Sequence, residues 1–154
     1  MFYKIQPATL AVLCRHPNIN AVKEASGNLA QISEIAALCG DDLIIYSGED
    51  GIIVPMLAVG AKGVISVLSN VAPRYTHDIC AKWFAGDTAG SLAMQLAALP
   101  LCKALFADVN PIPVKWAMNR LGWHAGACRL PLVAPNEAVQ AQLDSALRAF
   151  GLLS

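Results

Sequence analysis

Apolar and turn-forming residues alternate in a repeating pattern over the first half of the chain. Three short apolar segments each run into Ser, Gly or Asn: residues 19–25, 43–47 and 63–68. Such segments, bounded by turn residues, are typical of buried strands. After each one, apolar residues recur at helical spacing: 29–39, 52–59 and 72–85. The pattern predicts three strand–helix units in tandem, which implies parallel strands joined by right-handed crossovers.

Boundary signals are clearest for the helix predicted at 29–39. Asn28 suits its N-cap, and Gln31 follows three residues later, as in a capping box. Gly40 stands directly after the last apolar position, where helices commonly end. A shorter helix is predicted ahead of the first strand, at residues 7–15, with Pro7 in its first turn.

The second half of the chain carries helical patterns only. Helices are predicted at 88–107, 113–121 and 136–150. Pro100 should kink or divide the longest of them. We therefore predict an α/β fold with two regions, namely βα units in residues 1–86 and a helical region in residues 87–154.

Composition supports a chain with a large buried core. Hydrophobic residues make up 56% of the sequence and charged residues 14%, a balance that argues against disorder and is typical of parallel-sheet proteins. Eleven basic and eleven acidic residues give a formal net charge of zero. Because these charges are scattered, nothing directs the chain to nucleic acid or to an anionic membrane.

Membrane insertion and disulfide bonding are also not expected. No segment approaches the roughly 20 uninterrupted apolar residues of a membrane helix. The five cysteines are odd in number and widely spaced, which favours free thiols and a cytoplasmic location. His77 and Cys80 are three residues apart on a predicted helix, but no second pair with ligand spacing accompanies them, so no metal site is predicted.

Lys23 is the first candidate for chemistry, because it lies near the end of a predicted strand that is otherwise largely apolar. Side chains alternate along a strand, so Lys23 shares a face with Ile19 and Ala21. In a barrel of parallel strands, the carboxyl ends of the strands form the catalytic mouth. A lysine buried there would be partly a neutral amine, which is the form that attacks a ketone. Periodicity alone also allows a lysine that extends from the strand end into solvent.

Four motifs resemble, in order and spacing, the C-terminal half of the dihydrodipicolinate synthase family. They are VKEASGN at 22–28, YSGED at 46–50, GAKGVISVLSN at 60–70 and NPIPVKWA at 110–117. The resemblance extends from about Pro7 to the end of the chain. It implies a partial (β/α)8 TIM barrel, corresponding to about the last three βα units, followed by a C-terminal helical appendix.

The resemblance also implies roles for individual residues. Lys23 corresponds to the family's lysine that forms an imine with pyruvate. Ile65 corresponds to the isoleucine whose backbone carbonyl lies beside the bound pyruvate, and Gly48 to a glycine that lines the site. Ser47 and Asn70 have weaker claims to contact. The implied enzyme is a lyase that condenses pyruvate with an aldehyde, aspartate semialdehyde, in lysine biosynthesis, and it needs no metal or organic cofactor.

Length separates this chain from the family pattern. A (β/α)8 barrel has eight strands in about 250 residues, whereas three strands are predicted here. The family's tyrosine proton relay and its threonine contacts to the pyruvate carboxylate have no counterpart in the sequence. We therefore expect little or no synthase activity from this chain alone. We also expect it to form homo-oligomers or to aggregate through an open sheet edge.

Two other interpretations remain open at the level of sequence. The first is a sister lyase with the same lysine and barrel, such as an N-acetylneuraminate lyase or a sugar-acid aldolase. The motifs SGED, GVISV and NPIPVK favour the synthase over these enzymes. The second is a non-catalytic fragment, or half of a split barrel that assembles with a partner half.

Overall fold

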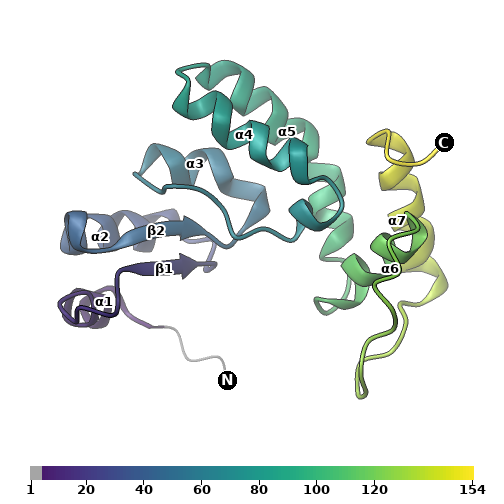
Figure 1. The fold of residues 1–154 in the computed structure, drawn as a ribbon, viewed down its shortest axis with the longest axis horizontal. Coiled ribbons are helices and arrows are strands. Elements are labelled where there is room, and N and C mark those ends of the chain that lie inside the picture. Colours follow the sequence, from purple (N-terminus) through teal and green to yellow (C-terminus); the bar gives the residue numbers. More distant parts are fainter. Residues whose placement is uncertain (1–4) are drawn as a thin grey trace. The chain divides into compact units, whose positions relative to one another are not determined.

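The computed structural model describes residues 5–154, and these form two compact units that divide after Ile65. The first unit contains α1 (Pro7–Leu13), β1 (Ala21–Glu24), α2 (Leu29–Cys39), the 3₁₀ turn η1 (Gly40–Asp42), β2 (Ile44–Ser47), the 3₁₀ turn η2 (Asp50–Ile52) and α3 (Ile53–Ala58) (Figure 1). The second contains the 3₁₀ turn η3 (Leu68–Asn70), α4 (Pro73–Phe84), α5 (Thr88–Leu105), α6 (Ile112–Arg120) and α7 (Glu137–Ala149). This division follows the contacts between residues. The division predicted from the sequence, after residue 86, instead separates the βα units from the helical region.

The first unit is built on a small parallel sheet in which β1 pairs with β2. Lys23 lies opposite Tyr46 in the register, and Glu24 lies opposite Ser47. The two strands point the same way in Figure 1, as two consecutive βα units require. The first two of the three predicted strands are therefore confirmed, although β1 is shorter than the expected 19–25.

The predicted third strand, 63–68, is wrong as a regular strand. It is reduced to one parallel bridge between Ser47 and Val64. The Ser47 amide donates to the Gly63 carbonyl at 2.9 Å, and the Ile65 amide donates to the Ser47 carbonyl at 2.7 Å. Pairing ends there because the Ser66 hydroxyl accepts a hydrogen bond from the Ser69 amide at 2.8 Å, which turns the chain into η3.

Side-chain alternation along β2 separates a covered face from an open one. Ile45 and Ser47 are buried, whereas Ile44 is 39% exposed. Ile45 belongs to an apolar cluster that also contains Leu10 from α1, Met56 from α3, and Ile32, Ile35 and Cys39 from α2. These helices therefore cover one face of the sheet. Over residues 5–65, the other face has no such cover.

The N-terminus of α2 is capped as predicted, but not by a capping box. The Asn28 side chain accepts hydrogen bonds from the Ala30 and Gln31 amides at 3.1 and 3.3 Å. The Gln31 side chain does not return to the cap, and instead donates to Glu24 at 3.4 Å. The Asn28 amide, which a capping box would satisfy, donates to the Ser26 hydroxyl at 3.1 Å.

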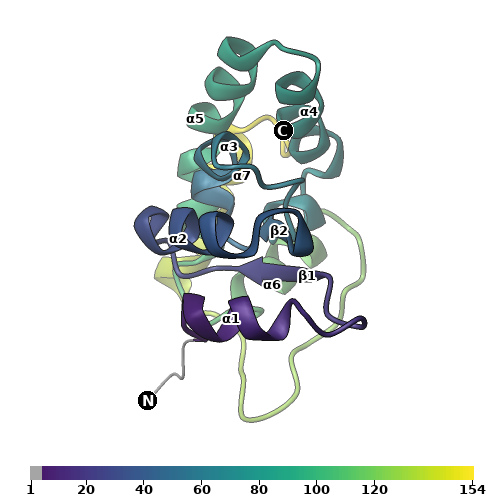
Figure 2. The same ribbon diagram turned by 90° about the vertical axis from the view of Figure 1, so that its left-hand side faces the viewer.

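The second unit is helical, as predicted. Figures 1 and 2 show α4 and α5 side by side, and a long connection, 121–136, joins α6 to α7. The core of the unit lies between α5, α6 and α7 and includes Leu101, Leu105, Ala117, Leu143 and Leu147.

Pro100 does not divide α5, which continues to Leu105. The helix is held by buried residues on both sides of the proline, Ala98 and Leu101, while Pro100 itself is exposed. Packing therefore outweighs the hydrogen bond that a proline cannot donate.

Among residues 5–154, none of the helices combines the length and apolar character needed to cross a membrane.

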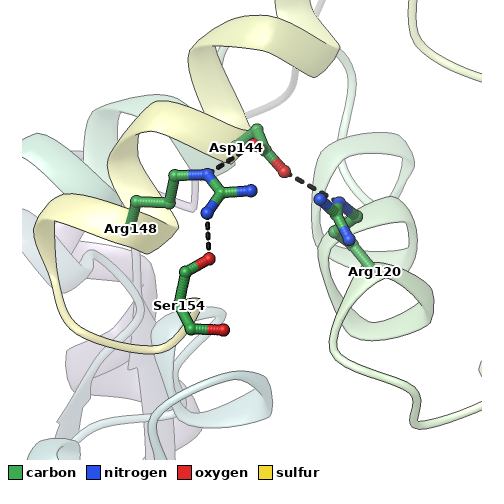
Figure 3. A network of polar contacts seen from close by, with 4 residues as sticks. All are labelled: Arg120, Asp144, Arg148 and Ser154. Carbon is green, nitrogen blue, oxygen red and sulfur yellow. Dashed lines mark hydrogen bonds and ion pairs between the residues drawn. The ribbon is translucent and has the colours of Figure 1, made fainter.

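A polar network at the end of the second unit connects α6 with α7 (Figure 3). Asp144 accepts hydrogen bonds from Arg120 Nε at 2.8 Å and from Arg148 Nε at 2.9 Å. Arg148 also donates to the carbonyl oxygen of Ser154. The hydrogen bond from Arg148, followed by that from Arg120, holds the pKa of Asp144 below its usual value. These groups lie at the surface, so each pair contributes little to stability.

Candidate active site

The carboxyl ends of the parallel segments in the first unit bring the predicted site residues to one edge. Lys23 is the third residue of β1, Gly48 directly follows β2, and Ile65 directly follows the bridge at Val64. Parallel strands end at the same edge of a sheet, so these three residues follow neighbouring segments at corresponding positions.

Lys23 and Gly48 lie in direct contact. A Cβ atom built on Gly48 would be 2.8 Å from Lys23 Cε, 3.0 Å from Lys23 Cγ and 2.7 Å from the Ala25 Cβ. The Gly48 amide also donates to the Glu24 carbonyl at 2.7 Å, which fixes the backbone at this point. Position 48 therefore favours glycine for steric reasons, because a Cβ there would clash with the Ala25 Cβ and would displace the flexible side chain of Lys23.

The lysine side chain lies on the open face of the sheet. Lys23 and Ala21 are exposed, and Tyr46, opposite Lys23 in the register, is half-buried. The sequence interpretation placed Lys23 in a buried pocket, whereas among the described residues of the first unit its side chain is exposed. The reason is that α1, α2 and α3 cover only the opposite face, where Glu24 is buried.

Glu24 is a part of this region that the sequence interpretation missed. Its carboxylate accepts hydrogen bonds from the Ser26 amide, at 3.2 Å to each oxygen, and from the Ser26 hydroxyl at 3.0 Å. Gln31 provides a further hydrogen bond at 3.4 Å, and Glu24 is 8% exposed. This network fixes the turn that follows Lys23. The available signal was an acidic residue on the face of β1 that the helices cover.

The hydroxyl of Ser47 is part of the turn after β2. It donates to the Glu49 carbonyl at 2.9 Å and accepts from the Glu49 amide at 3.2 Å, and the residue is fully buried. Ser47 therefore shapes the backbone around Gly48.

Two further site candidates differ in their surroundings. The Ile65 side chain is 47% exposed, while its amide is fixed by the Ser47 carbonyl. Asn70 lies in the second unit, where its amide group donates to the Val67 carbonyl at 3.0 Å.

Over residues 5–154, no three His, Cys, Asp or Glu side chains are grouped as a metal ion would require.

A sequence model of the Dihydrodipicolinate synthetase family matches residues 2–150. The chain belongs to this family. The 4-hydroxy-tetrahydrodipicolinate synthase of Lachnoclostridium phytofermentans is 50% identical over 150 residues, which are 97% of this chain and 51% of that relative. The chain thus spans about half the length of the curated relatives that it matches.

Solved structures of the dihydrodipicolinate synthase family agree with this assignment. The enzyme from Cyanidioschyzon merolae with lysine bound matches with a TM-score of 0.93 and 35% identity, over 98% of this chain and 51% of the other. The chloride-inhibited enzyme from Acinetobacter baumannii complexed with pyruvate matches with a TM-score of 0.91 and 31% identity, over 96% and 51%. The fold described above is therefore half of a dihydrodipicolinate synthase-type fold.

Proposed function

We propose that this chain is the lysine-bearing half of a pyruvate-dependent Schiff-base lyase of the 4-hydroxy-tetrahydrodipicolinate synthase type. Its substrates are pyruvate and aspartate semialdehyde, in lysine biosynthesis. The observation that carries the proposal is the position of Lys23, at the carboxyl end of β1 and against the bare backbone of Gly48. The 50% identity to a named synthase supports the same activity.

Lys23 supplies the nucleophile in the proposed reaction. Its neutral amine attacks the keto carbon of pyruvate, and loss of water gives an imine whose protonated form accepts electrons. The pyruvate methyl group then loses a proton, and the resulting enamine adds to the aldehyde carbon of the second substrate. Hydrolysis of the imine releases the lysine. Gly48 leaves room beside the amine, and the Ile65 carbonyl lies beside the bound pyruvate.

Activity requires a second half of the fold. The chain corresponds to about the last three βα units of a (β/α)8 barrel, with the C-terminal helices as an appendix. Lys23 is exposed and Ile44 and Ile65 are 39% and 47% exposed. Covering this face would desolvate the amine and exclude water from the imine. We therefore propose that these 154 residues alone turn over little substrate.

Reductive trapping tests the proposal directly. The chain is incubated with pyruvate and borohydride, with and without the N-terminal half of a full-length family synthase, and the labelled peptide is identified by mass spectrometry. We expect one reduced pyruvate on Lys23, with the yield rising when the complementary half is present. Lys23→Arg is the control and should remain unlabelled. Labelling at Lys62 instead, or no labelling with the complementary half present, would rule out the assigned lysine.

A second candidate function is a non-catalytic half-barrel that binds a partner half. The exposed apolar positions beside Lys23 favour it, because such a face is unfavourable in water. A turnover assay with both substrates and the complementary half present distinguishes the two, because only a lyase half gains activity, and solution mass reports the association. A rate near that of a full-length synthase from the chain alone contradicts the need for a second half, and a monodisperse monomer with a cooperative melt contradicts the expected self-association.

A further inference from the structure

Two cysteines come together where α1 packs against α2. Cys14 is the C-cap residue of α1, and Cys39 is the last residue of α2. Both belong to the apolar cluster of the first unit, together with Leu10, Ile35 and Leu43. Twenty-four residues, including all of β1, lie between these two cysteines, which the packing of the helices brings into one cluster.

The two thiols pack in the same apolar cluster but differ in exposure. Cys39 is 5% exposed, whereas Cys14 is only half-buried and also donates to the Ala11 carbonyl at 3.5 Å. Burial raises the pKa of Cys39, and the nearby Cys14 raises it further. Cys39 is thus kept as a buried thiol, beside a partner that a small reagent in solution can reach.

We propose that Cys14 and Cys39 form a dithiol pair that a low-molecular-weight disulfide, such as oxidised glutathione, converts to an intramolecular disulfide. The thiolate of Cys14 attacks one sulfur of the reagent and releases one glutathione. Cys39 then gives its proton to solvent and displaces the second glutathione from Cys14. Two protein thiols are oxidised by two electrons, and one glutathione disulfide is reduced to two glutathione molecules.

The disulfide would close a loop that contains β1 and Lys23. It would join the end of α1, before β1, to the end of α2, after β1. Such a cross-link restricts the unfolded chain and should raise the melting temperature of the first unit. The inference does not rest on lyase chemistry, so it holds or fails separately from the proposed function.

Peptide mapping of the oxidised full chain tests the pair. The protein is treated with oxidised glutathione in native buffer and in urea, quenched with acid, alkylated and digested. In native buffer we expect the Cys14–Cys39 peptide to be the predominant cross-link, together with a higher melting temperature that dithiothreitol reverses. In urea, the same oxidant should give several pairings among the five cysteines.

Single variants provide the controls. Cys39→Ser should leave Cys14 as a stable mixed disulfide with glutathione, because the second displacement has no thiol. Cys128→Ser, a substitution in the second unit, should leave the Cys14–Cys39 cross-link unchanged. The proposal is overturned if wild-type Cys14 accumulates only as the mixed disulfide. It is also overturned if the pairings in native buffer match those in urea.

Discussion

The side chain of Lys23 lies so close to Gly48 that a methyl group at position 48 would be 2.8 Å from Lys23 Cε. The contact joins the residue that carries the proposed nucleophile to the turn after the neighbouring strand. Because the Gly48 amide is hydrogen-bonded to the Glu24 carbonyl, the backbone has little freedom to move away. The position of the lysine amine therefore depends on the absence of a side chain at residue 48.

Gly48→Ala should displace Lys23 and reduce the rate of imine trapping. Misplacement of a reacting group by about 1 Å can cost on the order of a hundredfold in rate, so we expect a loss of at least tenfold. The measurement is borohydride trapping with pyruvate in the presence of the complementary half. Gly60→Ala is the matched control, since a Cβ there has no neighbour within 4 Å and any effect comes from its positive φ of 102°. Equal trapping by wild type and Gly48→Ala would show that the contact is unimportant.

Glu24→Ala should destabilise the first unit. The substitution removes a buried carboxylate that accepts hydrogen bonds from Ser26 and Gln31. Hydrogen bonds to charged groups contribute about 1.5–3 kcal/mol, and we expect a loss of free energy of unfolding in that range. Urea unfolding followed by circular dichroism measures it. Glu24→Gln retains one acceptor oxygen and should lose less, so equal losses from the two variants would argue against the hydrogen-bond explanation.

Asn28→Ala should weaken α2 through its N-terminus. The substitution leaves the Ala30 and Gln31 amides without the side-chain acceptor seen in the structure. Loss of an N-cap costs about 1 kcal/mol. Asn28→Asp keeps the acceptor and should remain close to wild type in thermal and urea unfolding. If Asn28→Ala unfolds at the same midpoint as the wild type, water replaces the side-chain cap without loss of stability.

Asp144 should make stability depend on pH. Arg148 and then Arg120 lower its pKa in the folded chain. Its stabilising effect is therefore complete above the ordinary value of about 3.9 and is lost as the pH falls through the lower folded value. Asp144→Asn should reduce the melting temperature slightly at neutral pH and leave it unchanged in strong acid, with a smaller difference at high salt. A difference that persists at low pH would point to packing instead of charge.

Local signals in the sequence were sufficient for most of the elements. Asn28 caps α2 and Gly40 follows it, Pro73 opens α4, and Asn136 caps α7 through a hydrogen bond from the Val139 amide at 3.0 Å. Each signal acts within one helical turn, so it can be read without knowledge of the fold. The segments 19–25 and 43–47 likewise contain the observed strands, because apolar runs bounded by turn residues need a sheet to bury them.

The tertiary structure decided what depends on residues far apart in the chain. It ended the third strand after a single bridge at Val64, continued α5 through Pro100, and brought Lys23 against Gly48. It also left the lysine on an open face and packed Cys14 against the apolar cluster that contains Cys39. The sequence by itself predicted which residues carry the proposed chemistry, and it determined roughly where strands and helices lie. Side-chain contacts and burial could be known only from the tertiary structure, because they depend on close packing between segments that are far apart in the sequence.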